Sequence, residues 1–377
     1  MKNSLDFGKL YKYLNKISEG GWYNIQPLLT YRKPALFITG ERGTGKSTSP
    51  ACFILLNFLV LGGHFIFVKE RFDDIPAVAN GYFDNAADLI NEKCAGMGLP
   101  TIIDVKYNQR KFYIATEEDE KGKPVYKQFG IARALEKQNQ TKGLVDDKTN
   151  ILFFDEFISD DLNSYIGGNS QRDLEWTRLL SLFITVDRRK GERYSNSTLL
   201  ICSANKSTVY CPILIGAGVI DYLQDGQKIT SPKNKMWVWE DTDKVEVEGQ
   251  PVEESFGYLL ADEQTKQVSF GNVSLDNNEF IKKPDVASYV ASFRLKGIDY
   301  GIYIDKDGYY YIWKAKEGYR AIALDPISHN GNDFQLINNF KESHIMCRVQ
   351  EMYKNGKLYF GDGKIKNEVL RYLKFMP

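Results

Sequence analysis

The residues best suited to chemistry form a glycine-rich loop, Gly40-Glu41-Arg42-Gly43-Thr44-Gly45-Lys46-Ser47, which is followed by Thr48. The loop matches the phosphate-binding pattern G-x-x-x-x-G-K-S/T in full. Its glycines let backbone amides wrap around a β-phosphate without Cβ clashes, and the start of a following helix adds partial positive charge. Lys46 would reach the β- and γ-phosphates, and the Ser47 hydroxyl would bind Mg²⁺. The loop therefore predicts a site for ATP and Mg²⁺.

Two acidic residues, Asp155 and Glu156, directly follow the apolar run from Ile151 to Phe154. On their own they are equally typical of a solvated strand end. Together with the upstream glycine-rich loop they indicate a hydrolytic site, in which Asp155 holds the hydrated Mg²⁺ and Glu156 polarises the attacking water. An ATPase is the enzyme class that this pair favours.

Further polar residues are candidates for sensing or stabilising the γ-phosphate. Asn205 ends the next apolar run, where its amide could hold the lytic water or serve only as a turn residue. A basic cluster follows the helix expected at Asp173 to Val186, and it contains Arg188, Arg189 and Arg193. One of these arginines could complete the nucleotide site of a neighbouring subunit. Alternatively, the cluster is only the solvated end of the helix. Arg42 could contact nucleotide, Glu156 or solvent.

The elements that must position these residues alternate between short buried strands and helices, as in an α/β fold with a mainly parallel sheet. We expect the strands at Ala35 to Thr39, His64 to Val68, Thr101 to Val105, Ile151 to Phe154 and Thr198 to Ser203. A hairpin is expected from Arg110 to Phe129. These segments predict an ATPase domain over residues 1–225, an acidic connector over 226–274 and a small α+β domain over 275–377, with a helix from Asn367 to Phe375.

Lysines of the hairpin and of the loop after it are candidates for contact with nucleic acid. Lys121 and Lys123 lie at the expected hairpin tip, and Lys137 and Lys142 lie in the polar loop before the Asp155 strand. Four acidic residues, Glu117 to Glu120, share the tip with the lysines, so a solvated polar hairpin explains the composition equally well. Contacts to phosphates would make binding dependent on salt.

Overall composition narrows the class of protein. The 377 residues carry 49 basic and 49 acidic side chains, so net charge cannot drive binding to nucleic acid or to a membrane, and any such contact must be local. The five cysteines form no CxxC pair and indicate buried, reduced thiols in a cytoplasm. No apolar run is long enough to span a bilayer, so we expect no membrane partner.

Beyond these separate motifs, the chain resembles the DNA-packaging motor ATPases of phi-29-like phages, which are relatives of the FtsK/HerA translocases. The resemblance is carried by GERGTGKS, HFIFVKERFDDI, KFYI, LFFDEFI, LLSLFITVDRRKGER, LLICSANKSTVYCP and VSLDNNEFI, in this order over most of the chain. A generic P-loop protein would share only the first and fourth of these segments. The resemblance implies an ASCE, RecA-like ATPase domain and a C-terminal domain with a vestigial RNase H-like nuclease fold.

The resemblance also implies a homopentameric ring that drives double-stranded DNA through the portal of a procapsid in the host cytoplasm, and that is absent from the mature virion. Residue by residue, it assigns phosphate binding to Lys46, Mg²⁺ binding to Ser47 and Asp155, catalysis to Glu156, sensing to Asn205 and the trans-acting arginine to Arg188. It places Lys121 to Lys123 in the DNA channel, although this hairpin is longer and more acidic than in the family. A structural RNA is a further candidate partner that the sequence leaves open.

Two alternative functions remain compatible with the residues. One is a P-loop NTPase that acts on protein or as a switch, with no nucleic-acid track. The other is a terminase-like enzyme that translocates DNA and also cuts it. Asp299, Asp305 and Asp307 are the acidic residues near one strand of the last domain, and we interpret them as turn residues rather than as a nuclease site.

Overall fold

The computed structural model describes residues 6–19, 21, 23–40, 43–136, 147–158, 175–188, 197–205, 211–219, 222, 229–242, 281–295, 298–318, 321–323, 344–362, 365–366 and 369. The described residues up to 242 belong to one compact unit, and those from 281 onward belong to a second. No helix among the described residues is long and apolar enough to cross a membrane.

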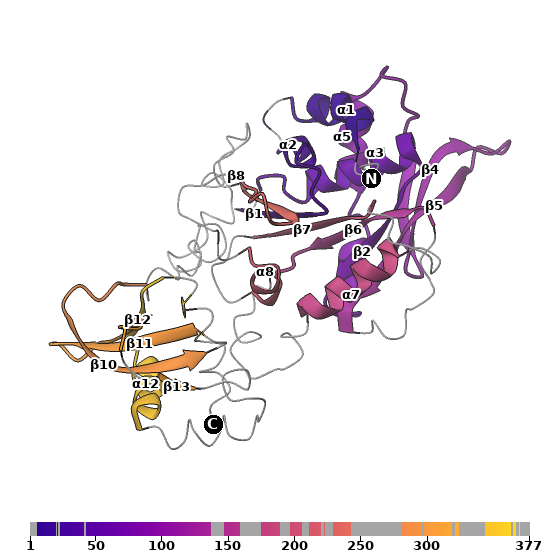
Figure 1. The fold of residues 1–377 in the computed structure, drawn as a ribbon. Helices are drawn as coiled ribbons and strands as arrows, with labels where there is room; N and C mark the ends of the chain where they lie inside the picture. Colours follow the sequence, from indigo (N-terminus) through magenta and orange to yellow (C-terminus); the bar gives the residue numbers. More distant parts are fainter. Residues whose placement is uncertain are drawn as a thin grey trace, which may run out of the picture. The chain divides into compact units, whose positions relative to one another are not determined.

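The first unit is built on one large sheet of mixed but mainly parallel strands (Figure 1). Its nine described strands lie in the order β3-β4-β5-β2-β6-β7-β1-β9-β8, and the six from β5 to β9 run parallel. The strands are β1 (Ala35–Gly40), β2 (His64–Lys69), β3 (Asp104–Asn108), β4 (Lys111–Glu118), β5 (Pro124–Ala134), β6 (Thr149–Asp155), β7 (Leu199–Asn205), β8 (Ile229–Thr230) and β9 (Trp237–Asp241). This confirms the α/β class with a mainly parallel sheet.

Four of the five predicted parallel strands are confirmed as β1, β2, β6 and β7. The prediction at Thr101 to Val105 is wrong, because β3 starts at Asp104 and pairs antiparallel with β4 at the sheet edge, where its side chains are not buried. The strand that pairs parallel with β2 on this side is instead β5, the second strand of the predicted hairpin. Its last six residues are buried except for the half-buried Ile131, and this lets the hairpin strand extend into the core of the sheet.

Sequence reasoning missed the strands β8 and β9. All five residues of β9 are buried, and β9 pairs parallel with β1 from Trp237 onward. The predicted connector over 226–274 therefore needs correction, because residues 229–242 belong to the sheet of the first unit. Acidic Glu240 and Asp241 suggested a solvated connector, whereas the aromatic side chains before them direct this segment into the core.

Helices cover both faces of the sheet and enclose two apolar cores (Figure 1). One face carries η1 (Gly8–Leu10), α1 (Tyr11–Ile17), α2 (Gln26–Leu29), α3 (Thr48–Leu61), α4 (Asp74–Ala79) and α5 (Asp84–Lys93). The other face carries α7 (Glu175–Asp187) and α8 (Pro212–Gly216). The first ten residues of α3 include nine buried ones, so α3 is a central helix packed between the sheet and α5. The helix predicted from Asp173 to Val186 is confirmed as α7.

The second unit is a small α+β domain, as predicted. Its sheet has the order β13-β10-β11-β12-β14, and the three strands β10, β11 and β12 form an antiparallel meander. The elements are β10 (Ala287–Leu295), β11 (Ile298–Asp305), β12 (Tyr310–Lys314), β13 (Ala321–Ala323), α12 (His344–Lys354) and β14 (Leu358–Phe360). Helix α12 was not predicted, and most of the helix predicted from Asn367 to Phe375 lies outside the described residues.

Acidic residues of this domain serve local structure. The Asp305 carboxylate accepts hydrogen bonds from the backbone amides of Asp307 and Tyr309, at 2.9 Å each, which is the turn role predicted for it. Asp299 instead forms a two-point ion pair with Arg294, at 2.6 and 2.8 Å. Within the described part of the chain, no group of three acidic, histidine or cysteine side chains could hold a metal ion.

Candidate nucleotide site

The glycine-rich loop connects the carboxyl end of β1 to the start of α3, as its sequence predicts. Gly43 and Gly45 have φ angles of 82° and 86°, which side chains with a Cβ rarely adopt. The loop then enters the helix through the hydrogen bond from the Ser49 amide to the Gly45 carbonyl, at 2.9 Å. Lys46 is buried within this turn. Glu41 and Arg42 lie outside the described residues.

A buried threonine cluster holds the loop against the sheet. The Thr44 and Thr242 hydroxyls lie 3.1 Å apart, and the Thr242 hydroxyl donates to the Thr39 carbonyl at 3.2 Å. Thr242 directly follows β9, so the strand that the sequence missed also supports the phosphate-binding loop. The remaining predicted loop residues, Gly40 at the end of β1 and Thr48 at the start of α3, lie at the two ends of this connection.

Asp155 lies at the carboxyl end of β6 and is enclosed by hydroxyl groups. The Ser47 hydroxyl donates to Asp155 Oδ1 at 3.0 Å, and the Tyr82 hydroxyl donates to Oδ2 at 2.6 Å. The Ser203 hydroxyl also donates to Oδ1. Burial, followed by repulsion from Asp155, raises the pKa of Tyr82 well above its ordinary value, so the phenol stays a donor. The structure thus joins Ser47 and Asp155, the two residues predicted to bind metal.

Glu156 follows Asp155 with a φ angle of 57°, an unusual conformation for a side chain of its size. Its side chain is 64% exposed, and its carboxylate accepts a hydrogen bond from Lys69 Nζ at 2.8 Å. The Lys69 side chain is only 6% exposed. It lies at the end of β2, the strand next to β6. A buried ammonium therefore holds the carboxylate of Glu156 at the edge of the sheet.

Asn205 lies at the same edge of the sheet as the loop and the carboxylates. It ends β7, where it pairs with Gly40, and Ser203 of the same strand pairs with Asp155. The carboxyl ends of parallel strands meet at one edge, and this edge is the usual place for ligands in open α/β sheets. Asn205 therefore lies between the phosphate-binding loop and the acidic pair.

Arg188 lies far from that edge in its own chain. It follows α7, whose last residue, Asp187, accepts a hydrogen bond from the Ser197 amide just before β7. The end of α7 is thus at the amino end of β7, about 20 Å from Asn205, since a strand rises roughly 3.3 Å per residue. Arg188 is exposed. Arg189 and Arg193, the alternatives to Arg188, lie outside the described residues.

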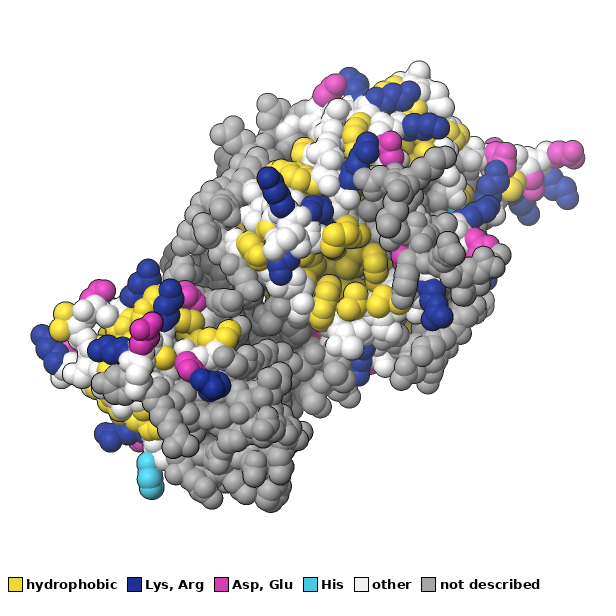
Figure 2. Space-filling model, viewed as in Figure 1, with side chains coloured by type: hydrophobic (Ala, Val, Ile, Leu, Met, Phe, Trp, Pro, Cys, Tyr) yellow, Lys and Arg dark blue, Asp and Glu magenta, His cyan; other side chains and the backbone are white. Residues whose placement is uncertain are grey.

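The predicted DNA-contacting lysines Lys121 and Lys123 are exposed at the tip of the β4–β5 hairpin. Their backbone amides donate to the Asp119 carboxylate at 2.8 and 2.9 Å, which fixes the turn. Figure 2 shows acidic and basic side chains side by side on this projection. Lys127 and Glu117 form an ion pair at 2.7 Å. The tip is therefore polar and mixed in charge. Lys137 and Lys142 lie outside the described residues.

Four side chains of the site were not identified as site residues from the sequence: Lys69, Tyr82, Ser203 and Thr242. They come from separate segments, and none is part of a local motif. The segments around Lys69 and Ser203 do belong to the family resemblance, as HFIFVKER and LLICSAN, and this was the signal that could have revealed them. Tyr82 and Thr242 had no comparable signal.

Comparison with known proteins extends these local observations to the whole chain. The family model described as podovirus DNA encapsidation protein (Gp16) matches residues 17–376. The DNA packaging protein of Bacillus phage phi29 is 25% identical over 353 residues, which cover 92% of this chain and 95% of that protein.

Solved structures agree on the fold. The bacteriophage Phi-29 viral genome packaging motor assembly is similar with a TM-score of 0.60 and 24% identity, over 94% of this chain and 99% of that one. The Phi-28 gp11 DNA packaging motor has a TM-score of 0.60 and 14% identity, over 95% of this chain and 99% of that one. Because the family model covers nearly the entire chain and confirms the resemblance seen in the motifs, this protein belongs to the podovirus DNA encapsidation family of phage DNA-packaging motor proteins.

Proposed function

We propose that the protein hydrolyses ATP to ADP and phosphate and couples this reaction to the movement of double-stranded DNA into a preformed capsid. The contact between Ser47 and Asp155 carries the proposal, because it brings the phosphate-binding loop and the acidic strand end together at hydrogen-bond distance. Glu156 follows at once in the chain. A loop for phosphates, a carboxylate for a metal and a second carboxylate for water are the parts that ATP hydrolysis requires.

Mg²⁺ is the metal that fits this donor set. Ser47 and Asp155 offer a hydroxyl and a carboxylate oxygen, and Mg²⁺ prefers few protein oxygens supplemented by water and nucleotide phosphates. Tyr82 and Ser203 would orient the Asp155 carboxylate from behind. Mg²⁺ bound there would neutralise charge on the β- and γ-phosphates. Lys46 would bind the phosphates themselves. The backbone amides from Gly40 to Thr48, with those of Glu41 and Arg42 among them, would bind the phosphates as well.

Glu156 is proposed as the residue that orients and deprotonates the attacking water. Its exposed carboxylate is held at the sheet edge by Lys69, where it can face water beside a bound γ-phosphate. Asn205, at the end of β7 and so on the strand directly beside β6, would hold the same water or sense the γ-phosphate. These roles follow from positions at one sheet edge together with the chemistry of the side chains.

Arg188 is proposed to act in the site of a neighbouring subunit. An exposed arginine at the opposite sheet edge cannot reach the nucleotide of its own chain, but it can complete a site in a closed ring. The family resemblance supports a homopentamer docked on the portal of the procapsid, in the host cytoplasm. It also supports a boundary near residue 275 between the ATPase and a C-terminal domain without nuclease activity, and it leaves a structural RNA open as a partner.

The β4–β5 hairpin is proposed to contact DNA through Lys121 and Lys123, together with Lys137 and Lys142 of the following loop. Backbone phosphates are the groups that such lysines recognise. Since Glu117 and Asp119 share the tip, we expect few phosphate contacts per subunit and an affinity that depends on the ring as a whole.

The test is steady-state ATP hydrolysis with and without linear duplex DNA, over a series of salt concentrations. We expect duplex to stimulate hydrolysis, the stimulation to fade as salt rises, and Glu156→Gln to abolish turnover. A variant with Lys121→Gln and Lys123→Gln should lose stimulation and keep basal hydrolysis. If duplex DNA leaves the rate of hydrolysis unchanged, both for the isolated protein and for the protein on assembled procapsids, an NTPase without a nucleic-acid track would be favoured. Metal-dependent cleavage of plasmid would favour a terminase-like enzyme.

A further inference from the structure

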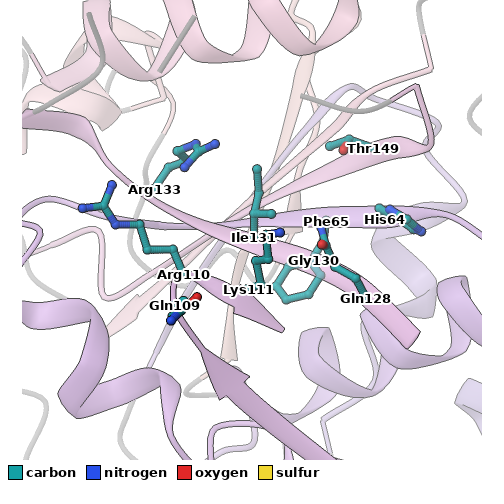
Figure 3. Close-up of a pocket in the computed structure, with 10 residues that line it drawn as sticks. All are labelled: His64, Phe65, Gln109, Arg110, Lys111, Gln128, Gly130, Ile131, Arg133 and Thr149. Carbon is teal, nitrogen blue, oxygen red and sulfur yellow. The ribbon is translucent and has the colours of Figure 1, made fainter. Parts of the chain in front are cut away.

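A cationic pocket lies on the sheet of the first unit, beside β2 and β5 (Figure 3). Its volume is about 330 Å³. It is lined by β2, β5, the start of β6 and the turn that joins β3 to β4. The apolar floor includes Phe65 and Ile131, and the cationic side chains are Arg110, Lys111 and Arg133. This size is at the lower end of the range for small-ligand sites.

Arg133 is the unusual residue of this pocket. It is 8% exposed, and the one hydrogen bond of its guanidinium to a described residue is a long contact of 3.4 Å from Nη1 to the carbonyl of the preceding Ala132. None of the described carboxylates lies within ion-pair distance of it. Burial of a charged group without a partner costs several kcal/mol. Burial, and then repulsion from Arg110, lowers the pKa of Arg133. Among the residues that the structure describes, the guanidinium therefore has no anion to accompany it.

Arg110 is presented to the same pocket by a strained turn. Gln109 and Arg110 have φ angles of 47° and 67°, and they connect the paired residues Asn108 and Lys111. Non-glycine residues in this conformation cost about 1–3 kcal/mol each. The Arg110 guanidinium lies 4.1 Å from the centre of the Phe72 ring, which holds its planar head group in place. Figure 3 shows the head groups of Arg110 and Arg133 on the same side of the pocket.

We propose that this pocket binds a phosphate group, with Arg133 and Arg110 as the ligands and Lys111 as a supporting charge. Planar guanidinium groups match the oxygens of phosphate in pairs and supply the hydrogen bonds that Arg133 lacks. Two sources share this chemistry, namely inorganic phosphate and a phosphodiester of duplex DNA. The site is separate from the nucleotide phosphates, because those lie at the loop between β1 and α3, and β1 is separated from β5 by three strands.

The test compares full-length wild type with Arg133→Met, Arg133→Lys and Lys46→Ala by thermal unfolding in increasing inorganic phosphate, and by binding of a short blunt duplex. Lys127→Met, in the same strand but paired with Glu117, is the matched control. In wild type and in the Lys127→Met control, we expect phosphate to raise the Tm. In Lys46→Ala the rise should persist, because the pocket does not use the loop. In Arg133→Met the phosphate affinity should fall about ten- to hundredfold, as expected when a charged hydrogen bond is lost.

A second readout separates a binding role from a structural one. Without phosphate, Arg133→Met should unfold at the wild-type temperature or above it, because a buried charge without a partner has been removed. Arg133→Lys should bind phosphate more weakly than wild type, since a point charge replaces the two-point donor. The proposal is overturned if neither phosphate nor duplex raises the wild-type Tm, or if Arg133→Met lowers the Tm and leaves phosphate affinity unchanged.

The measurement of duplex binding distinguishes the two sources of the phosphate group. If a DNA phosphate is the ligand, Arg133→Met should weaken duplex binding and make the logarithmic salt dependence shallower by about one unit. If inorganic phosphate is the ligand, duplex binding should be unchanged while the effect of phosphate on Tm is lost. Because these measurements do not involve ATP turnover, they test the phosphate site independently of the proposed motor activity.

Discussion

Tyr82 provides the sharpest test of how the site is held together. Its hydroxyl donates to Asp155 at 2.6 Å in a partly buried setting, and Phe in its place would remove this bond with little change of volume. A hydrogen bond to a charged group contributes about 1.5–3 kcal/mol. For a domain of this size, that corresponds to a fall in Tm of about 3–12 °C for Tyr82→Phe.

The predicted loss depends on pH in a defined direction. The pKa of Tyr82 is raised in the folded protein, so the folded state keeps the proton above pH 10 while the unfolded state loses it. Stability that comes from this group is thus complete below the unfolded pKa and declines as pH rises, by about 1.4 kcal/mol per pH unit. Tyr82→Phe lacks this titration. The stability difference between wild type and variant should therefore shrink between pH 10 and pH 11.

The assay is urea unfolding combined with the Mg²⁺ dependence of ATP hydrolysis. Tyr13→Phe is a control for a neutral acceptor, because its hydroxyl donates to the Met97 carbonyl at 3.3 Å, and it should cost about 0.5–1.5 kcal/mol. Tyr23→Phe is a control for a charged acceptor remote from Asp155, because its buried hydroxyl donates to Glu240 at 2.6 Å.

Both Tyr23→Phe and Tyr82→Phe should lose similar stability, but only Tyr82→Phe should weaken Mg²⁺ activation, by about ten- to hundredfold, as for other residues that orient a metal ligand. If Tyr82→Phe unfolds at the wild-type urea concentration and keeps the wild-type Mg²⁺ requirement, the reasoning about Asp155 is wrong.

Three further predictions concern other parts of the first unit and the cysteines. Lys69→Met should lower ATP hydrolysis about tenfold or more, because the Glu156 carboxylate is no longer held in place. It should change the free energy of unfolding by less than about 1 kcal/mol, because solvent screens the exposed carboxylate. Full activity together with a large loss of stability in urea would contradict this prediction. Four of the five cysteines are buried, and burial raises the pKa of Cys52 to about 12. The native protein should therefore react rapidly with a thiol reagent only at Cys347, whereas the denatured protein should react at all five cysteines. Gly130→Ala would place a Cβ 2.0 Å from the Phe65 ring, and should destabilise the fold by about 1–3 kcal/mol in urea unfolding; an unchanged midpoint would show that the ring can move.

Local sequence was sufficient for the nucleotide-binding elements. The glycine-rich loop, the Asp155–Glu156 pair and Asn205 each directly follow a buried apolar run, and parallel strands bring their carboxyl ends together. The strands β1, β2, β6 and β7 were predicted because each is short, apolar and bounded by polar residues. Family membership followed from the same motifs, since their order along the chain is more specific than any one of them.

Strand order could not be obtained in the same way. β5 pairs antiparallel with β4 and parallel with β2, and a local pattern does not reveal which neighbour a strand will have. β9 was missed because Glu240 and Asp241 resemble a solvated connector until their buried partners are known. The Tyr23 hydroxyl, for instance, is 217 residues away from Glu240 in sequence.

The sequence by itself thus determined the candidate site, because the phosphate loop and the acidic pair are contiguous motifs whose backbone geometry depends on neighbouring residues. Tertiary structure alone decided what surrounds them. Lys69, Tyr82, Ser203 and Thr242 come from four separated segments, and Arg133 becomes a buried cation only when β5 enters the sheet. Burial and partners of a charge are properties of the packed molecule, so these residues acquire their roles only through the fold.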